Sequence, residues 1–430
     1  MSLILAPTGL PLKELTQLRC FEDLVHILLH ESIATPSKRD AFLQRLFSLR
    51  FLPVTVSAML ELLPASTHPV DVLRIGISLL GALEPESEIN DAITIAYRLQ
   101  SVAPLILLHW HIWHEGGHRL QLGKEQLRPI THNPNETAAE FFLGTFHSSL
   151  HTKRGAAGLG PHLPDENDEN EVEEAEAFTQ QTWAEETGVA LPEVMLSTDT
   201  QPEISDFEAL KLLWILVAED ELSSSTFAGR VAASALSDFY GCIAASLAAY
   251  RGPLDSGGAA EVAYWQLCEA WREGRKAGDD APNVYKLDPV ALRNYMQTVI
   301  ASGRMFMGFG HRVIKGIDPR ASLLRQECRK MARLGREPQL FACALEMERI
   351  MLEDVKLHAT VEFFAGLLLS QLSLPVSLLS AICALARLPA WSAHILEQRA
   401  NPCLLRPIAE FVVPPQGLLT MESKTTARRR

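Results

Sequence analysis

The apolar residues of this chain recur mainly with the period of an α-helix. In CFEDLVHILLHE (20–31) and SKRDAFLQRLFSLR (37–50), they return at three- and four-residue spacings with charged residues between them, which is typical of a helix with one buried face. The pattern continues in FEALKLLWILVAEDEL (207–222) and in the Ala- and Ser-rich stretch 225–250. Alternating strand patterns are almost absent. The sequence therefore predicts a mostly α-helical, all-α fold.

One uncharged run, residues 366–386, is long enough to raise the question of a membrane span. It contains Gln371, Pro375 and four serines, so two buried helices joined at the proline are favoured. The N-terminal stretch has no basic residue before Lys13 and only a very short apolar start. Neither a secretory signal nor a transit peptide is indicated, and a cytoplasmic protein without a membrane partner is expected.

The net charge of −13 is concentrated in one segment. Between Asp165 and Asp206 there are fourteen acidic residues and no Lys or Arg, so the rest of the chain is nearly neutral. A polar, like-charged stretch poor in aromatic residues predicts a disordered insertion at about 155–206. The remainder lacks the concentrated basic composition that nucleic-acid binding requires, and no nucleic-acid partner is expected.

Cysteine and histidine positions give little support for a metal. The seven cysteines are scattered without C-x-x-C spacing, which fits a reducing compartment rather than a zinc site or a disulfide framework. Four histidines crowd LLHWHIWHEGGHR, and a metal site on one helix face is the alternative to aromatic packing with hydrogen-bonded imidazoles. Packing is favoured, so no metal or cofactor is expected. The four are His109, His111, His114 and His118.

The stretch MFMGFGHRVIKGIDPRA (305–321) carries the strongest chemical signal. Glycines on both sides of Phe309 allow close backbone approach to a ligand, and Pro319 fixes the turn that presents Arg320. An arginine and His311 held near each other suit a carbonyl compound with a carboxylate: the guanidinium grips the carboxylate and the imidazole donates to the carbonyl oxygen. The alternative is a structural turn. The stretch is not a dinucleotide fingerprint, because no third glycine follows and no strand precedes it.

Six segments, in order along the chain, resemble the citrate synthase family. The sequences AHILEQR and HWHIWHEGG are most similar to the 2-methylcitrate synthase branch of that family. The resemblance implies an all-α citrate synthase-type fold, a homodimer, and condensation of an acyl-CoA with oxaloacetate followed by thioester hydrolysis. The segments are HPVDVLRIGISLLGALEPE (68–86), LVAEDELSSSTFAGRVAASALSDFY (216–240), RGPLDSGGAAE (251–261), GFGHRVIKGIDPR (308–320), LHATVEFFAGLLL (357–369) and ALARLPAWSAHILEQRANPCLLRP (384–407).

The resemblance also implies roles for individual residues. His311 corresponds to the histidine that polarises the oxaloacetate carbonyl, and Lys315 falls where a basic residue meets a CoA phosphate. Arg74 lies in a family segment that touches ligand. The three arginines that correspond to the family's carboxylate-binding set, the last reaching the partner subunit's site, are Arg320, Arg387 and Arg406.

Three family positions are altered. Glu362 replaces the aspartate that removes the α-proton, which lengthens the acid by one methylene. The histidine that stabilises the enol is replaced by Asp255 or Ser256, depending on where a one-residue insertion is placed. Asp220 replaces a further oxaloacetate-binding histidine, and an ionised carboxylate there repels a dicarboxylate unless the arginines or a proton neutralise the pair.

A large domain is expected from 1–251 and 361–430, with a small domain from 252–360. The predicted function is an acyl-CoA:oxaloacetate C-acyltransferase that makes an alkylcitrate- or methylcitrate-type product. The alternative is an impaired family member that binds a dicarboxylate or CoA, or pairs with an active paralogue. A changed reaction, thioester hydrolysis or citryl-CoA cleavage, also stays open.

Overall fold

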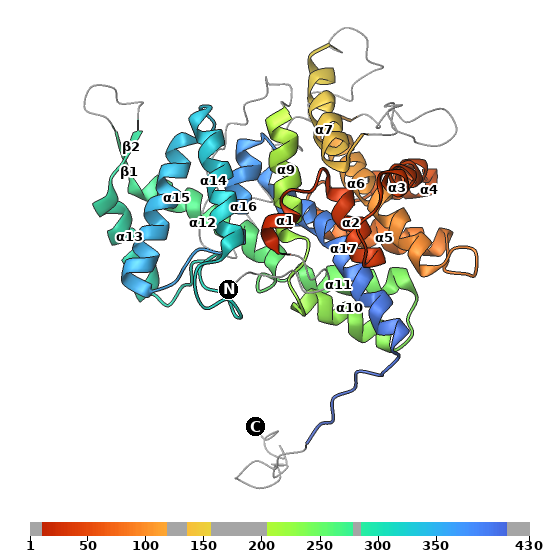
Figure 1. Ribbon diagram of the computed structural model, residues 1–430. Coiled ribbons are helices and arrows are strands. Elements are labelled where there is room, and N and C mark those ends of the chain that lie inside the picture. The colour runs from red at the N-terminus through yellow and green to blue at the C-terminus, as the bar shows by residue number, and fades with distance from the viewer. Residues whose placement is uncertain (1–10, 118–135, 156–203, 278–284, 411–430) are drawn as a thin grey trace, which may run out of the picture.

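The computed structural model describes residues 11–117, 136–155, 204–277 and 285–410 (Figure 1). Most of the predicted acidic insertion at 155–206, and His118, lie outside the described residues.

Helices make up almost all of the described secondary structure. The only paired strands among the described residues are two short antiparallel ones, β1 and β2, with Lys276 opposite Lys286. The elements are α1 (Leu12–Leu15), α2 (Phe21–His30), α3 (Pro36–Ser48), α4 (Val54–Glu61), α5 (Pro69–Leu83), α6 (Ala92–Gly116), α7 (Ala138–Gly155), α9 (Ile204–Val217), α10 (Ser224–Ser234), α11 (Phe239–Tyr250), α12 (Ser256–Gly274), β1 (Arg275–Ala277), β2 (Tyr285–Leu287), α13 (Pro289–Ala301), α14 (Pro319–Arg333), α15 (Pro338–Ile350), the π-turn η1 (Met351–Val355), α16 (Val361–Gln371), the 3-10 turn η2 (Val376–Leu378) and α17 (Leu379–Ala400).

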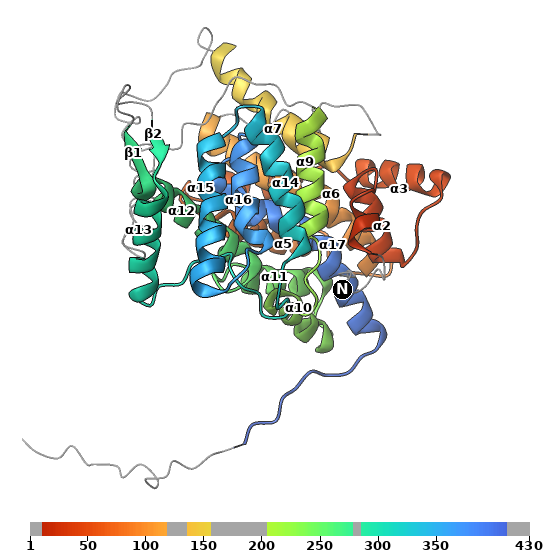
Figure 2. The same ribbon diagram turned by 60° about the vertical axis from the view of Figure 1, so that its left-hand side comes forward.

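Helix α17 runs through the middle of the molecule and organises its core (Figures 1 and 2). It packs against α2, α5, α6, α9, α10, α11 and α12, and its Trp391 is buried among them. Because neighbours surround it, its sequence is apolar on most sides rather than along one stripe.

The uncharged run 366–386 folds as predicted. Helix α16 ends at Gln371, the chain turns through Leu374 and Pro375, and α17 follows. Two segments of the described chain, 92–116 and 376–400, are long and apolar enough to cross a membrane, but 72% and 89% of their most apolar windows are buried inside the protein. They are core helices.

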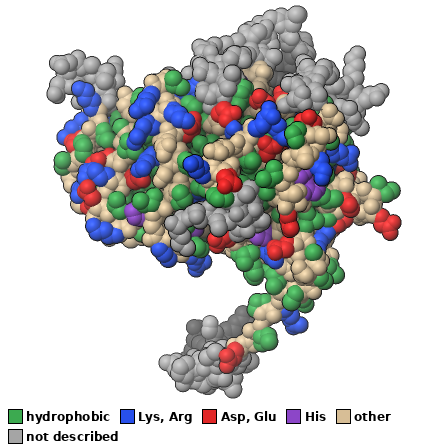
Figure 3. Space-filling model, in the orientation of Figure 1, with side chains coloured by type: hydrophobic (Ala, Val, Ile, Leu, Met, Phe, Trp, Pro, Cys, Tyr) green, Lys and Arg blue, Asp and Glu red, His purple; other side chains and the backbone are tan. Residues whose placement is uncertain are grey.

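Residues 401–410 form an extended segment (Figure 2), which is still tied to the body where the amide of Leu405 donates to the hydroxyl of Ser234 at 3.1 Å. Its side chains are mostly exposed, and Ile408 is 97% exposed. Figure 3 shows apolar side chains along this segment, whereas basic, acidic and apolar side chains are interspersed over the body. The boundaries between a large and a small domain at 251 and 360 stay a prediction.

Candidate active site

A short backbone bridge brings two distant segments together. Phe309 pairs antiparallel with Ala359, and two backbone hydrogen bonds of 2.8 and 2.9 Å flank the pair. His311 lies two residues after one bridging residue, and Glu362 lies three residues after the other. The expected electrophile and the expected base therefore come from adjoining segments.

The glycines on either side of Phe309 allow the two segments of this bridge to approach closely. Gly308 and Gly310 have φ angles of +79° and +76°, a region that residues with a Cβ rarely adopt. A Cβ on Gly308 would lie 2.9 Å from the Cβ of Phe363. The expectation of close backbone approach at this stretch holds, but the partner is the backbone at the start of α16.

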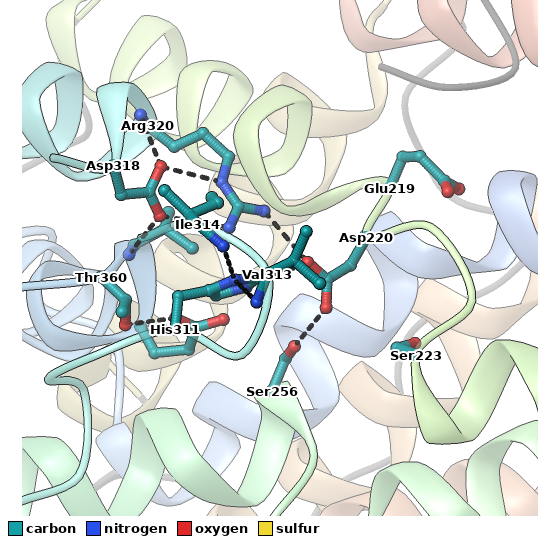
Figure 4. A network of polar contacts seen from close by, with 12 residues as sticks. Glu219, Asp220, Ser223, Ser256, His311, Val313, Ile314, Asp318, Arg320 and Thr360 are labelled. Atoms are coloured by element: carbon teal, nitrogen blue, oxygen red, sulfur yellow. Dashed lines mark hydrogen bonds and ion pairs between the residues drawn. The ribbon is translucent and has the colours of Figure 1, made fainter. Parts of the chain in front are cut away.

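His311 is oriented by the loop that follows it. Its Nδ1 accepts hydrogen bonds from the amides of Val313 (3.1 Å) and Ile314 (2.9 Å). In the neutral ring this places the proton on Nε2. Nε2 faces the carboxylate of Asp220, 3.7 Å away (Figure 4). Asp220 raises the pKa of His311, although partial burial of the imidazole acts in the opposite direction.

Arg320 is held by a buried carboxylate at the start of its own helix. Asp318 caps α14 by accepting from the amide of Arg320 at 2.9 Å. It also accepts from Nε and Nη2 of the guanidinium, each at 3.1 Å. Its second oxygen accepts from the amide of Val361 at 3.3 Å. The Asp-Pro-Arg step therefore fixes the guanidinium and ties α14 to α16.

Asp220 lies in the loop between α9 and α10, where Glu221 adopts a left-handed conformation (φ +53°). One oxygen of its carboxylate is 3.4 Å from Nη1 of Arg320, and the other is 3.5 Å from Nη2 of Arg387. With His311, three groups that the resemblance assigns to the acceptor surround one carboxylate of the chain itself. Figure 4 shows His311 and Arg320 beside it.

These partners keep Asp220 ionised. Burial acts to raise its pKa, but the contact with His311 and the charges of Arg387 and Arg320 outweigh burial and hold the pKa well below its ordinary value. The neighbouring Glu219 points away from the cluster (Figure 4) and contacts His394 at 3.2 Å.

The structure separates the roles of Asp255 and Ser256. Asp255 is buried at the N-cap of α12, where it accepts from the amide of Ser256 (2.8 Å) and from the amide and hydroxyl of Ser225 (2.8 and 3.3 Å). Ser256 instead lies in the cluster. Its hydroxyl accepts from Nη2 of Arg387 at 2.9 Å and donates to Asp220 at 3.4 Å.

Glu362 occupies the first turn of α16, where the helix dipole favours a carboxylate. Its Oε2 accepts from the hydroxyl of Thr360 at 2.5 Å. Its charge contributes to the pKa shifts of both His311 and Arg320, which places the carboxylate in the same electrostatic neighbourhood.

Other predicted site residues do not contact this cluster within the described part of the chain. Arg74 pairs with Asp71 on α5 at 2.8 Å. Lys315 is exposed in the loop after His311, and Arg406 is exposed on the C-terminal segment. Their roles stay predictions.

The crowded histidines on α6 are packed, as the favoured interpretation expects. His109 is buried and contacts Glu61 at 3.1 Å. His111 stacks on Phe146, with ring centroids 5.3 Å apart. No three His, Cys, Asp or Glu side chains among residues 11–117, 136–155, 204–277 and 285–410 group closely enough to hold a metal ion.

Sequence reasoning missed three supporting residues. Asp318 was visible as part of Asp-Pro-Arg, and its position two residues before the arginine was an available signal for a helix cap. Thr360 and Ser225 gave no comparable signal, because their partners are fixed only when α16 and α12 are packed.

Comparison with known proteins gives a consistent result. The sequence model of the citrate synthase C-terminal domain matches residues 4–408. The chain is 26% identical over 421 residues to the 2-methylcitrate synthase of Shewanella oneidensis, covering 97% of this chain and 91% of that protein. It is 27% identical over 414 residues to citrate synthase 2 of Bacillus subtilis, covering 94% and 89%.

Solved structures agree. Citrate synthase from Thermotoga maritima superposes with a TM-score of 0.65 at 25% identity, covering 95% of this chain and 88% of that one. Citrate synthase from Thermoplasma acidophilum, solved in a ternary complex with carboxymethyl coenzyme A and oxaloacetate, superposes with a TM-score of 0.69 at 21% identity, covering 94% and 89%. The predicted all-α fold is confirmed, and the chain belongs to the citrate synthase family.

Proposed function

We propose that this chain is a C-acyltransferase that condenses an acyl-CoA with oxaloacetate or a related 2-oxo acid, giving a product of the alkylcitrate or methylcitrate type. One observation carries the proposal: His311 and Arg320, from the 308–320 segment, and Arg387, from α17, converge on the carboxylate of Asp220, and Glu362 adjoins them. The named relatives include a 2-methylcitrate synthase and a citrate synthase.

Each group has a role that its environment supports. Glu362 removes the α-proton of the acyl-CoA. His311 donates from Nε2 to the acceptor's carbonyl oxygen as the new C–C bond forms. The guanidinium groups hold acceptor carboxylates. Water then hydrolyses the thioester and releases the CoA thiol. Lys315 is proposed to meet a CoA phosphate, and Arg406 to enter the partner subunit's site.

Ser256 is the candidate replacement for the lost enol donor. Its hydroxyl lies in the cluster, whereas Asp255 is committed to the cap of α12 and to Ser225. A donor to a developing oxyanion contributes roughly 10²–10³-fold to the rate, so a weak or misplaced hydroxyl leaves a slower enzyme than a histidine would.

Thiol release tests the proposal. The wild type should release CoA thiol when a 2-oxo acid is supplied with acetyl-, propionyl- or a longer acyl-CoA. Glu362→Gln should lower kcat by about 10²–10⁴-fold, since it removes the base without changing its shape, and Glu362→Asp should retain part of the rate. Acceptor-free reactions serve as the control. No acceptor-dependent release with any pair would exclude the synthase.

The second candidate is a ligand-binding family member without turnover. The favouring observation is Asp220, whose carboxylate already pairs with both arginines. Calorimetry with CoA and with dicarboxylates separates the two: binding without thiol release supports this candidate.

A further inference from the structure

The carboxylate of Asp220 has the surroundings of a bound ligand carboxylate. It faces two guanidinium groups at 3.4 and 3.5 Å, the Nε2 of His311 at 3.7 Å, and the hydroxyl of Ser256 at 3.4 Å. Charged donors of this kind are what a protein supplies to an anionic ligand. Here a side chain of the protein occupies the position.

The two arginines differ in how many of their N–H groups lack a hydrogen-bond partner. Arg320, 3% exposed, uses Nε and Nη2 on Asp318 and Nη1 on Asp220. Arg387, 1% exposed, uses only Nη2, and its buried Nε and Nη1 have no hydrogen-bond partner in the described structure. Buried donors are normally satisfied. The cluster therefore retains donors for about one further carboxylate, on Arg387.

The charges lead to the same conclusion. The guanidinium group of Arg320 shares its neighbourhood with the carboxylates of Asp220, Asp318 and Glu362, and that of Arg387 with the carboxylates of Asp220, Glu219 and Asp255. A ligand with one carboxylate adds one negative charge to this set, whereas oxaloacetate adds two. Like charges brought together in a partly buried site oppose binding strongly.

We propose that Asp220 is a specificity-determining residue that fills one acceptor-carboxylate position, so that the site selects a 2-oxo monocarboxylate, of the pyruvate or 2-oxobutyrate class, over oxaloacetate. The inference rests on the condensation proposed above and names its acceptor. The single carboxylate of the acceptor binds the free donors of Arg387, and its carbonyl oxygen faces Nε2 of His311.

The reaction balances with this acceptor. Glu362 takes the α-proton, and the α-carbon of the acyl group forms a bond to the carbonyl carbon. The carbonyl oxygen becomes an alkoxide and takes the Nε2 proton of His311; the ring recovers a proton from water, and Glu362 releases the α-proton to water. Water then cleaves the thioester, giving a thiol and a 2-alkyl-2-hydroxy dicarboxylate.

Steady-state kinetics with pyruvate, 2-oxobutyrate and oxaloacetate test this assignment. In the wild type, kcat/KM for the better monocarboxylate should exceed that for oxaloacetate at least about tenfold. Asp220→Asn and Asp220→His should shift the ratio about 10²-fold toward oxaloacetate, because each removes one negative charge beside the second carboxylate. Glu221→Gln, which removes an exposed charge one residue away, should leave the ratio unchanged.

The outcomes separate this inference from the proposed function. Turnover that favours oxaloacetate in the wild type, or a ratio that Asp220→Asn does not change, overturns the assignment of Asp220 and leaves the condensation standing. If no acceptor supports turnover, calorimetry with pyruvate and oxaloacetate decides. Tighter oxaloacetate binding in Asp220→Asn supports the role of Asp220 while excluding the condensation. If turnover is absent and Asp220→Asn binds pyruvate and oxaloacetate with the wild-type affinities, both the role of Asp220 and the condensation are overturned.

Discussion

At the scale of single residues, His311 and Asp220 are electrostatically coupled. They lie on segments 91 residues apart, and Nε2 of the imidazole faces the carboxylate at 3.7 Å. The carboxylate favours the charged ring and raises the pKa of His311, and the ring in turn helps to lower the pKa of Asp220. Each group therefore shifts the pKa of the other toward its charged form.

Removing the carboxylate should lower the pKa of His311. In Asp220→Asn the imidazolium loses its ion partner, so the ring should lose its proton at a lower pH than in the wild type. NMR titration of the imidazole protons measures this. Since the folded-state pKa of His311 is raised, the contribution of its charged form to stability is complete below the unfolded value of about 6.5 and declines as pH rises through the folded pKa. An equal or higher pKa in Asp220→Asn would contradict the pairing.

The residues of the cluster were predictable to different degrees. His311 and Arg320 stand out within one glycine-flanked motif, and the resemblance added Arg387 and Glu362. The ion pairs of Asp220 with both arginines were not visible, because the three residues lie at least 67 positions apart along the chain. A linear pattern does not encode which distant side chains a loop brings together.

At the scale of elements, the start of α12 combines a structural and a chemical residue. Asp255 caps the helix and also satisfies the buried amide of Ser225 at the start of α10, so it joins two helix N-termini. Ser256 projects into the cluster instead. Adjacent residues thus have separable effects.

Asp255→Ala should destabilise the protein by about 1–3 kcal/mol, because it removes a cap and leaves a buried amide unsatisfied. Urea unfolding measures the change. Asp238→Ala, which removes the exposed cap of α11, is the matched control and should cost less. Ser256→Ala should change unfolding less than Asp255→Ala but lower the rate of thiol release. If Asp255→Ala lowered the rate of thiol release and Ser256→Ala lowered the unfolding stability more, Asp255 rather than Ser256 would belong to the catalytic cluster.

Helical periodicity located the elements well. The helices expected within 20–31 and 37–50 are present as α2 and α3, and the one expected within 207–222 is α9, which begins earlier, at Ile204, and ends at Val217. The stretch 225–250 divides into α10 and α11 where Leu236 adopts a left-handed φ of +59°. The β1–β2 pair was not predicted, since strands of three residues are too short to show alternation.

At the scale of the whole molecule, the extended C-terminal segment leads away from the body (Figure 2), and Arg406 is exposed on it, after the contact of Leu405 with the body. An exposed arginine among exposed apolar residues such as Leu404 and Ile408 is consistent with a segment that reaches another subunit. The homodimer implied by the resemblance stays a prediction.

Mixing two inactive variants tests this arrangement. If Arg406 completes the partner's site, heterodimers of Arg406→Ala and Glu362→Gln contain one intact site, and random mixing should restore about a quarter of wild-type activity. Subunits are exchanged by co-refolding, and thiol release is measured. A mixture of Glu362→Gln with His311→Ala, whose lesions lie in the same cluster, should restore nothing. Equal recovery in both mixtures, or none in the first, would contradict a shared site.

The carboxylate of Asp318 has a wider consequence than orienting one side chain. It is 1% exposed and binds the guanidinium of Arg320 with one edge and the amide of Val361 with an oxygen. The guanidinium of Arg320 and the first turn of α16, which bears Glu362, are therefore both held by the carboxylate of Asp318. A substitution of Asp318 would therefore displace Arg320 and the helix turn that bears Glu362 together. The positions of these two groups cannot be changed independently by substitutions at residue 318.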